Sequence, residues 1–308
     1  MNKLTDDFQR NYADKQFMNE DVLKGISGNV KLHDEIKNVR SSAAACLNVM
    51  GYLNQHNQDI IPFFSQLGLN LNKVIDFPSG MIFDGESYDD QGPIVFEWIG
   101  PKKSPINEKG GSRGQNKTSI DAYFLAEING KITQIFIEWK FTEQYNSESD
   151  THKFGGKKGI ERLRRYSGVL VQLRKKGFPF RFNEEDKIGL ADFSYEPFYQ
   201  LLRMTLLAKK TTPVKFDKLD VEDYKIVHLS HSSNSGLNIL SENHLKYSPG
   251  LTVNIGNSLH DTWISLLEEN EKQRHVMAYW DKALPNLSDN LDKKYLVDRY
   301  YEEVRHCI

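Results

Sequence analysis

Apolar and polar residues alternate along two neighbouring stretches in the middle of the chain. Apolar positions recur at every second residue in 120–128, and the same period returns in 134–141. Between the two stretches stands Asn129-Gly130, a pair that suits a two-residue type I′ turn because both central residues of that turn need positive φ. The pattern predicts an antiparallel hairpin with one face in the core.

The turn also fixes the register of the predicted hairpin. If Ile128 faces Lys131, then Asp121 faces Glu138, and Lys140 lies diagonally on the same face. Facing residues have Cβ atoms roughly 4.5–5.5 Å apart, so the two carboxylates repel unless they share a cation or a proton. The register therefore indicates a divalent metal site. The alternatives are an exposed sheet face with ordinary charges and a bulge that shifts the register.

The remaining pattern predicts an α/β protein. The expected elements are a helix in 31–53, a strand in 93–99, a loop in 106–118, a basic helix in 157–176, an amphipathic helix in 195–210, a buried strand in 224–229, and helices near 258–275 and 289–306. This order suits a sheet covered by helices, with a C-terminal helical layer. We expect a lead-in at 1–30, a core at 31–250 and a helical extension at 251–308.

Composition excludes several classes of protein. With 308 residues, of which 39% are hydrophobic, the chain can bury a sizeable core. A net charge of −2 excludes the overall basic field of a histone-like binder, so binding to nucleic acid must depend on local clusters. Cys46 and Cys307 form no disulfide framework, and no stretch resembles a signal peptide or a membrane span. We expect a cytoplasmic protein with no membrane partner.

The predicted hairpin resembles the core hairpin of the PD-(D/E)XK nuclease superfamily. Ser119-Ile120-Asp121 supplies its first acid, with Ile120 in place of the usual proline, and Ile137-Glu138-Trp139-Lys140 supplies its Glu-x-Lys. A looser similarity, to a branch of uncharacterised bacterial restriction-endonuclease-like proteins, rests on Ser41-Ser42, Arg113-Gly114 and the run Tyr195–Arg203. The resemblance implies a restriction-endonuclease-like mixed β-sheet flanked by helices.

The resemblance also implies roles for the residues of the hairpin. Asp121, Glu138 and Lys140 would be catalytic. Asp121, Glu138 and the main-chain carbonyl of Trp139 would bind Mg²⁺, for which Mn²⁺ can substitute. Glu97 lies in an apolar strand before the hairpin and would complete the metal site; the alternative is an ordinary glutamate of an edge strand.

Basic residues gather on both sides of the hairpin. Those expected to contact a nucleic-acid backbone are Arg113, Lys117, Lys157, Lys158, Arg162, Arg164 and Arg165. A solvated helix face is the alternative for the residues after 156, because that helix also carries apolar positions. Gln200 and Arg203 are three residues apart on the amphipathic helix, so they share a face that could reach a phosphate, the active-site acids or only solvent.

These features predict a Mg²⁺-dependent phosphodiesterase that hydrolyses nucleic acid, with DNA favoured over RNA and an endonuclease over an exonuclease. The resemblance implies a place in restriction or phage defence, with a helicase or another defence protein as partner, and a homodimer is also open. One alternative is a nucleic-acid-binding or sensing subunit whose partner supplies the main activity, although the complete Asp, Glu and Lys trio argues against it. Another is an enzyme for a small phosphorylated substrate, which the absence of a phosphate-cradling glycine loop disfavours.

Overall fold

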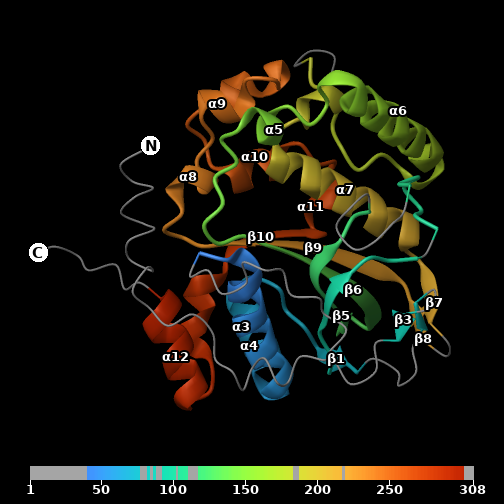
Figure 1. The fold of residues 1–308 in the computed structure, drawn as a ribbon. Helices are drawn as coiled ribbons and strands as arrows, with labels where there is room; N and C mark the ends of the chain where they lie inside the picture. Colours follow the sequence, from blue (N-terminus) through green and yellow to red (C-terminus); the bar gives the residue numbers. More distant parts are fainter. Residues whose placement is uncertain are drawn as a thin grey trace, which may run out of the picture.

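A central β-sheet lies between two sets of helices (Figure 1). The computed structural model describes residues 40–76, 82–83, 86–87, 92–101, 103–109, 117–182, 187–216 and 219–301. The sheet has six strands in the order β1-β5-β6-β9-β10, with β4 also paired to β5. The predicted α/β fold, a mixed sheet flanked by helices, is confirmed.

Strands and helices follow one another in runs along the chain. The strands are β1 (Lys73–Ile75), β2 (Ile82–Phe83), β3 (Glu86–Ser87), β4 (Val95–Trp98), β5 (Ile120–Ile128), β6 (Lys131–Trp139), β7 (Val214–Phe216), β8 (Leu219–Val221), β9 (Asp223–Ser230) and β10 (His275–Tyr279). The α-helices are α3 (Ser42–Gln55), α4 (Ile60–Gln66), α5 (Glu148–Thr151), α6 (Gly156–Leu173), α7 (Glu196–Thr211), α8 (Ser235–Asn238), α9 (Glu242–Leu245), α10 (Leu259–Ser265), α11 (Glu269–Lys272) and α12 (Leu291–Tyr300).

The hairpin of β5 and β6 has the register that its turn predicts. Ile128 pairs with Lys131, and the pairing continues without a shift to Ala122 and Ile137. Asn129 and Gly130 have φ values of 51° and 74°, as a type I′ turn requires. One further step along the same register brings Asp121 opposite Glu138.

Helices cover both faces of the sheet. Helices α3, α4 and α12 lie on one face, over Phe124 and Ile137, whereas α6, α7 and α10 lie on the other, over Tyr123 and Phe136 (Figure 1). All four of these side chains are fully buried. The prediction of a single buried face is therefore wrong. The alternate positions of the hairpin carry large apolar residues as well, and these can be buried only because a second helical layer covers them.

The sheet is completed by parallel strands. Strand β9 pairs in parallel with β6, and β10 pairs in parallel with β9. The helix predicted near 258–275 is thus two short helices, α10 and α11, followed by a strand. The pairing with β9 gives residues 275–279 their extended conformation, and this long-range contact leaves no mark on the local pattern. Helix α12 confirms the second C-terminal helix, although residues 302–308 lie outside the described ranges.

The first described helix begins later than the sequence pattern suggests. Helix α3 starts at Ser42, and the side chain of Ser41 caps it by accepting a hydrogen bond from the N–H of Ala44 at 3.1 Å. The predicted lead-in at 1–30 and the start of the predicted helix at 31–39 lie outside the described residues.

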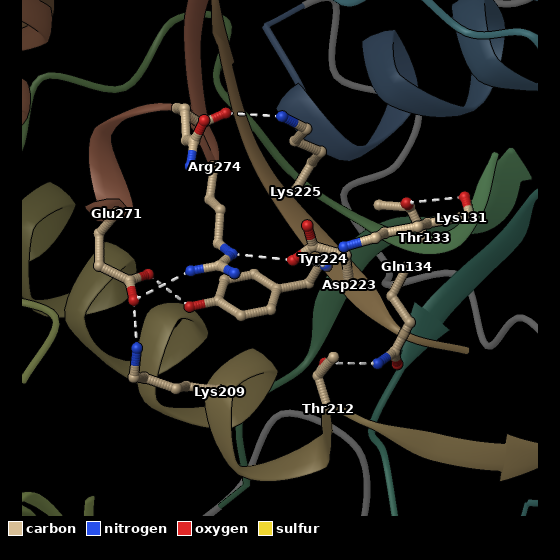
Figure 2. A network of polar contacts seen from close by, with 11 residues as sticks. Lys131, Thr133, Gln134, Lys209, Thr212, Asp223, Tyr224, Lys225, Glu271 and Arg274 are labelled. Carbon is tan, nitrogen blue, oxygen red and sulfur yellow. Dashed lines mark hydrogen bonds and ion pairs between the residues drawn. The ribbon is translucent and has the colours of Figure 1, made fainter. Parts of the chain in front are cut away.

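A buried network of polar contacts joins α7, α11 and β9 (Figure 2). The fully buried carboxylate of Glu271 forms ion pairs with Lys209 and Arg274, and it accepts a hydrogen bond of 2.5 Å from the hydroxyl of Tyr224. Arg274 is also held by Asp223, at 2.8 Å. Asp223 pairs with Thr133 near the start of β6, whereas Glu138 lies near the end of that strand. The network therefore stabilises the end of the sheet that is distant from Glu138.

Candidate active site

A cleft of about 290 Å³ opens at the end of the sheet where β5 begins and β6 ends. Its walls come from the residues before β5, from both strands of the hairpin and from α7. The lining residues are Lys117, Thr118, Ser119, Asp121, Glu138, Lys140, Glu196, Gln200, Arg203 and Met204. Six of the residues predicted for the site therefore line one cleft: Lys117, Asp121, Glu138, Lys140, Gln200 and Arg203.

The hairpin brings the two acids and the lysine of the motif together. The main-chain N–H of Trp139 donates a hydrogen bond of 2.7 Å to Oδ2 of Asp121. Nζ of Lys140 lies 2.6 Å from Oε1 of Glu138, and both side chains are almost fully buried. The predicted trio is thus assembled by the register of a single turn.

The electrostatics of the trio reflect two carboxylates in a small volume. Burial, followed by the charges of Glu138 and Glu97, raises the pKa of Asp121 well above its ordinary value, and only Lys140 and the N–H of Trp139 oppose this. Burial alone would lower the pKa of Lys140, but Glu138 and its other neighbours raise it well above its ordinary value. The lysine therefore stays charged, but its single positive charge does not balance the two carboxylates.

Glu97 lies beside Asp121 on the neighbouring strand. Phe96 pairs with Ala122 and Trp98 with Ile120. Glu97 therefore lies opposite Asp121, at a position where the strand pairing is interrupted. Its φ of 52° is a left-handed conformation that a glutamate rarely adopts, and it accepts a hydrogen bond of 2.5 Å from the Ser119 hydroxyl. Strained backbone beside an acid pair is typical of a functional position.

Helix α7 supplies the opposite wall of the cleft. Gln200 and Arg203 both line it, so their shared face borders the same cleft as Asp121 and Glu138. Oε1 of Gln200 is buried and has no hydrogen-bond partner within the described part of the chain. Glu196 also lines the cleft and forms an ion pair with Lys153. Sequence reasoning missed Glu196, although its place four residues before Gln200 puts it on the same helical face.

A second acid that the sequence analysis missed is Glu108. Its buried carboxylate accepts hydrogen bonds from Thr118, Tyr166 and Arg203. No periodic pattern marks this residue, because it lies in an irregular stretch before the hairpin. Its role depends on contacts made far along the chain.

The basic helix α6 divides its charges between two sides. Lys158, Arg162 and Arg165 follow the spacing i, i+4, i+7, so they share one flank. Arg162 marks this flank as the side of the cleft, because its guanidinium lies 5.4 Å from the ring of Tyr199, which Arg203 also contacts from 5.3 Å.

The outer side of α6 carries the other predicted cations. Lys157 and Arg164 lie on it, together with the exposed side chains of Ile160 and Val171. The sequence predicts one nucleic-acid-binding group, whereas the helix presents only part of it towards the cleft. Arg113, also predicted to contact nucleic acid, lies outside the described residues.

Oxygen atoms are the donors that the cleft offers to a cation. Asp121 and Glu138 supply carboxylates, and the main-chain carbonyl of Trp139 directly follows Glu138 in the chain. Among the residues that the structure describes, no group of three or more His, Cys, Asp and Glu side chains is spaced to hold a metal ion. One or two carboxylates, completed by water and phosphate oxygens, are the usual donor set for Mg²⁺ in enzymes that act on phosphates.

A family known as restriction endonuclease associating with ARP (REase-ARP) matches residues 4–300. The chain belongs to this family. No curated protein and no solved structure matches it. The match extends over all three predicted parts of the chain. It supports a restriction-endonuclease-like protein.

One buried residue of this REase-ARP chain extends the row of polar groups across the sheet. His228 pairs with Glu138 in the parallel register of β6 and β9, and neither of its ring nitrogens has a partner in the described ranges. Burial, followed by the charges of His260 and Lys140, lowers the pKa of His228 well below its ordinary value. The ring is therefore neutral and adds no positive charge to the acids.

In the described residues, no helix is long and apolar enough to cross a membrane.

Proposed function

We propose that this protein is a metal-dependent nuclease of the PD-(D/E)XK superfamily that hydrolyses phosphodiester bonds of nucleic acid. The observation that carries the proposal is the cleft in which Asp121 and Glu138 face each other while Lys140 forms an ion pair with Glu138. Membership of a restriction endonuclease family supports a nuclease. We favour DNA over RNA and internal cleavage over trimming from ends.

Asp121, Glu138 and the carbonyl of Trp139 are the groups that would hold Mg²⁺ or Mn²⁺, with Glu97 as a further carboxylate. The fit rests on the donor set, two carboxylates that face each other across the hairpin with the single cation of Lys140 beside them. Burial, followed by the charge of Glu138, also raises the pKa of Asp121. A divalent cation bound there would lower the pKa of a water molecule and neutralise charge on the scissile phosphate.

The remaining groups of the cleft act on the phosphate and on the attacking water. Lys140 is cationic and fixed by Glu138, so its ammonium can orient a nucleophile or stabilise negative charge in the transition state. The unpartnered Oε1 of Gln200 can accept a hydrogen bond from a water molecule. Arg203 contributes a guanidinium at the wall of the same cleft. The flank of α6 with Lys158, Arg162 and Arg165 would guide the rest of the backbone.

The family name supports a protein partner. We propose that the chain acts together with an ARP protein, as the name of its family describes, and that the pair serves in restriction or phage defence. The alternative partner is a helicase or another defence protein that delivers the nucleic acid to the cleft.

The direct test incubates the purified protein with supercoiled plasmid, linear duplex, single-stranded DNA and RNA, each with Mg²⁺, Mn²⁺ or EDTA. We expect metal-dependent nicking or linearisation of the plasmid, lost in EDTA. The Glu138→Gln variant is the matched control for a contaminating nuclease, because it removes the motif with an isosteric side chain. Cleavage by Glu138→Gln at the parental rate would overturn the proposal, and binding without cutting by the parent would favour a sensing subunit instead.

A further inference from the structure

Glu108 joins three parts of the fold at the rim of the cleft. Its Oε2 accepts a hydrogen bond of 2.6 Å from the N–H of Thr118. Its Oε1 accepts hydrogen bonds from the Thr118 hydroxyl at 2.9 Å, from Tyr166 on α6 at 3.1 Å and from Nε of Arg203 on α7 at 3.1 Å. Only 2% of the side chain is exposed. One carboxylate thus ties the basic helix, the wall helix and the entry to β5.

These bonds fix one edge of the Arg203 guanidinium and leave the other edge open. Nε of Arg203 is shared between Glu108 and the Thr118 hydroxyl, each at 3.1 Å. Its two Nη groups donate to no residue within the described ranges, although Arg203 lines the cleft. The ring of Tyr199, 5.3 Å from the guanidinium, supports one side of it. A guanidinium held in this way presents a fixed pair of donors, which matches two oxygens of one phosphate.

We propose that Glu108 is a positioning residue that orients Arg203 to bind a backbone phosphate next to the scissile bond. The inference rests on the proposed nuclease function and deepens it by assigning how the substrate is held. Tyr166 extends the arrangement to α6, because its hydroxyl contacts Glu108 and its helix carries Arg162 and Arg165. One buried acid thereby contacts both helices whose cations would meet the phosphates.

The sign of the Glu108 effect separates positioning from plain electrostatics. Nucleic acid is a polyanion, so removing an acid near its binding surface should strengthen binding. If Glu108 instead orients Arg203, Glu108→Gln replaces one of two acceptor oxygens with an NH₂ group. A single oxygen is then left for the donors of Thr118, Tyr166 and Arg203, so the guanidinium is held less firmly and binding weakens. Glu161 on α6 is a matched control, since it is exposed and contacts only Lys109, at 3.4 Å, within the described chain.

The experiment measures the affinity of a labelled duplex by fluorescence anisotropy in Mg²⁺, with every variant built on Glu138→Gln to prevent cutting. Glu108→Gln should weaken binding roughly tenfold, whereas Glu161→Gln should leave it unchanged or tighten it. Arg203→Gln should lower the affinity for the duplex by a similar factor. The double variant Glu108→Gln/Arg203→Gln should bind no more weakly than Arg203→Gln alone, because both changes remove the same contact.

A thermal melt of each variant checks that it folds. If Glu108→Gln does not fold, Tyr166→Phe takes its place: it removes one donor to Glu108 and should weaken binding only in the presence of Arg203. Unchanged or tighter binding by Glu108→Gln, or losses that add to those of Arg203→Gln, would overturn the inference. A parent that shows this coupling and yet cuts no substrate would overturn the nuclease proposal and support the positioning role. A parent that binds no nucleic acid would overturn both.

Discussion

The main-chain N–H of Trp139 donates a hydrogen bond of 2.7 Å to the carboxylate of Asp121, across the hairpin from one strand to the other. One oxygen of the acid is therefore held by the backbone of the partner strand. The residue also lines the cleft, together with Glu138 and Lys140. Because the bond needs only an acceptor, an amide side chain can keep it.

Asp121→Asn should abolish the rise in melting temperature that Mg²⁺ causes. Relieving the repulsion with Glu138 should leave the melting temperature without metal at least as high as that of the parent, since the hydrogen bond to Trp139 survives. Mg²⁺ should raise the melting temperature of the parent by binding the native state and should leave the variant unchanged. Thermal unfolding over a Mg²⁺ series, with cleavage assayed in parallel, measures both. A full Mg²⁺ response in the variant would contradict the assignment of Asp121 as a ligand.

Lys140→Met should behave in the opposite way. It leaves both carboxylates in place and removes the cation that partly neutralises Glu138, so the melting temperature without metal should fall. Mg²⁺ should still stabilise the variant, whereas the cleavage rate should fall by roughly 10²- to 10³-fold, the scale seen when one transition-state donor is lost. Single-turnover kinetics at saturating Mg²⁺ make the comparison. Parental rates would show that the ammonium takes no part in the chemistry.

Glu97→Gln should change how much metal the enzyme needs. The side chain is isosteric and can still accept the hydrogen bond from Ser119, so the fold should be kept. If Glu97 helps to hold the cation beside Asp121, cleavage by the variant should need a higher Mg²⁺ concentration to reach half its maximum rate. A Mg²⁺ titration of the initial rate decides this. An unchanged midpoint would leave Glu97 as a structural residue of β4.

The two sides of α6 allow a matched test of the phosphate contacts. Lys158→Gln/Arg165→Gln on the flank of the cleft should lower the slope of log affinity against log salt by about 0.9 per lost contact on duplex DNA. Lys157→Gln/Arg164→Gln removes the same two residue types from the outer side and should barely alter the slope. Binding is measured between 50 and 200 mM salt, on the order of the range used for such slopes. Equal slopes for the two variants would show that the flank has no special role.

His275 should make the protein less stable in mild acid. Burial, followed by the positive charges of Arg274, Lys225 and Lys209, lowers the pKa of His275 from 6.5 to about 3, and its Nδ1 accepts a hydrogen bond of 3.1 Å from the indole of Trp263. Because the folded pKa is depressed, this stability is present above pH 6.5 and is lost as the pH falls towards 3, by about 1.4 kcal/mol per pH unit. Urea unfolding of the parent and His275→Gln between these limits measures the difference. Parallel pH profiles would contradict it.

The residues of the trio could be read from the sequence because their placement is local. The Asn129-Gly130 turn admits one register, and the period of two carries that register along nine residues in each strand to Asp121 and Glu138. Lys140 follows from the same geometry. Gln200 and Arg203 follow from the period of a single helix.

Tertiary structure alone decided the remainder of the site and of the sheet. Glu108 lies near Arg203 only because α6 and α7 pack on the same face of the sheet, and β10 is a strand only because β9 offers it a free edge. Neither contact follows from a repeating pattern, since each joins segments separated by tens of residues. Turn chemistry and periodicity act within a few neighbouring positions, whereas burial and the satisfaction of buried charges depend on what the whole chain brings together.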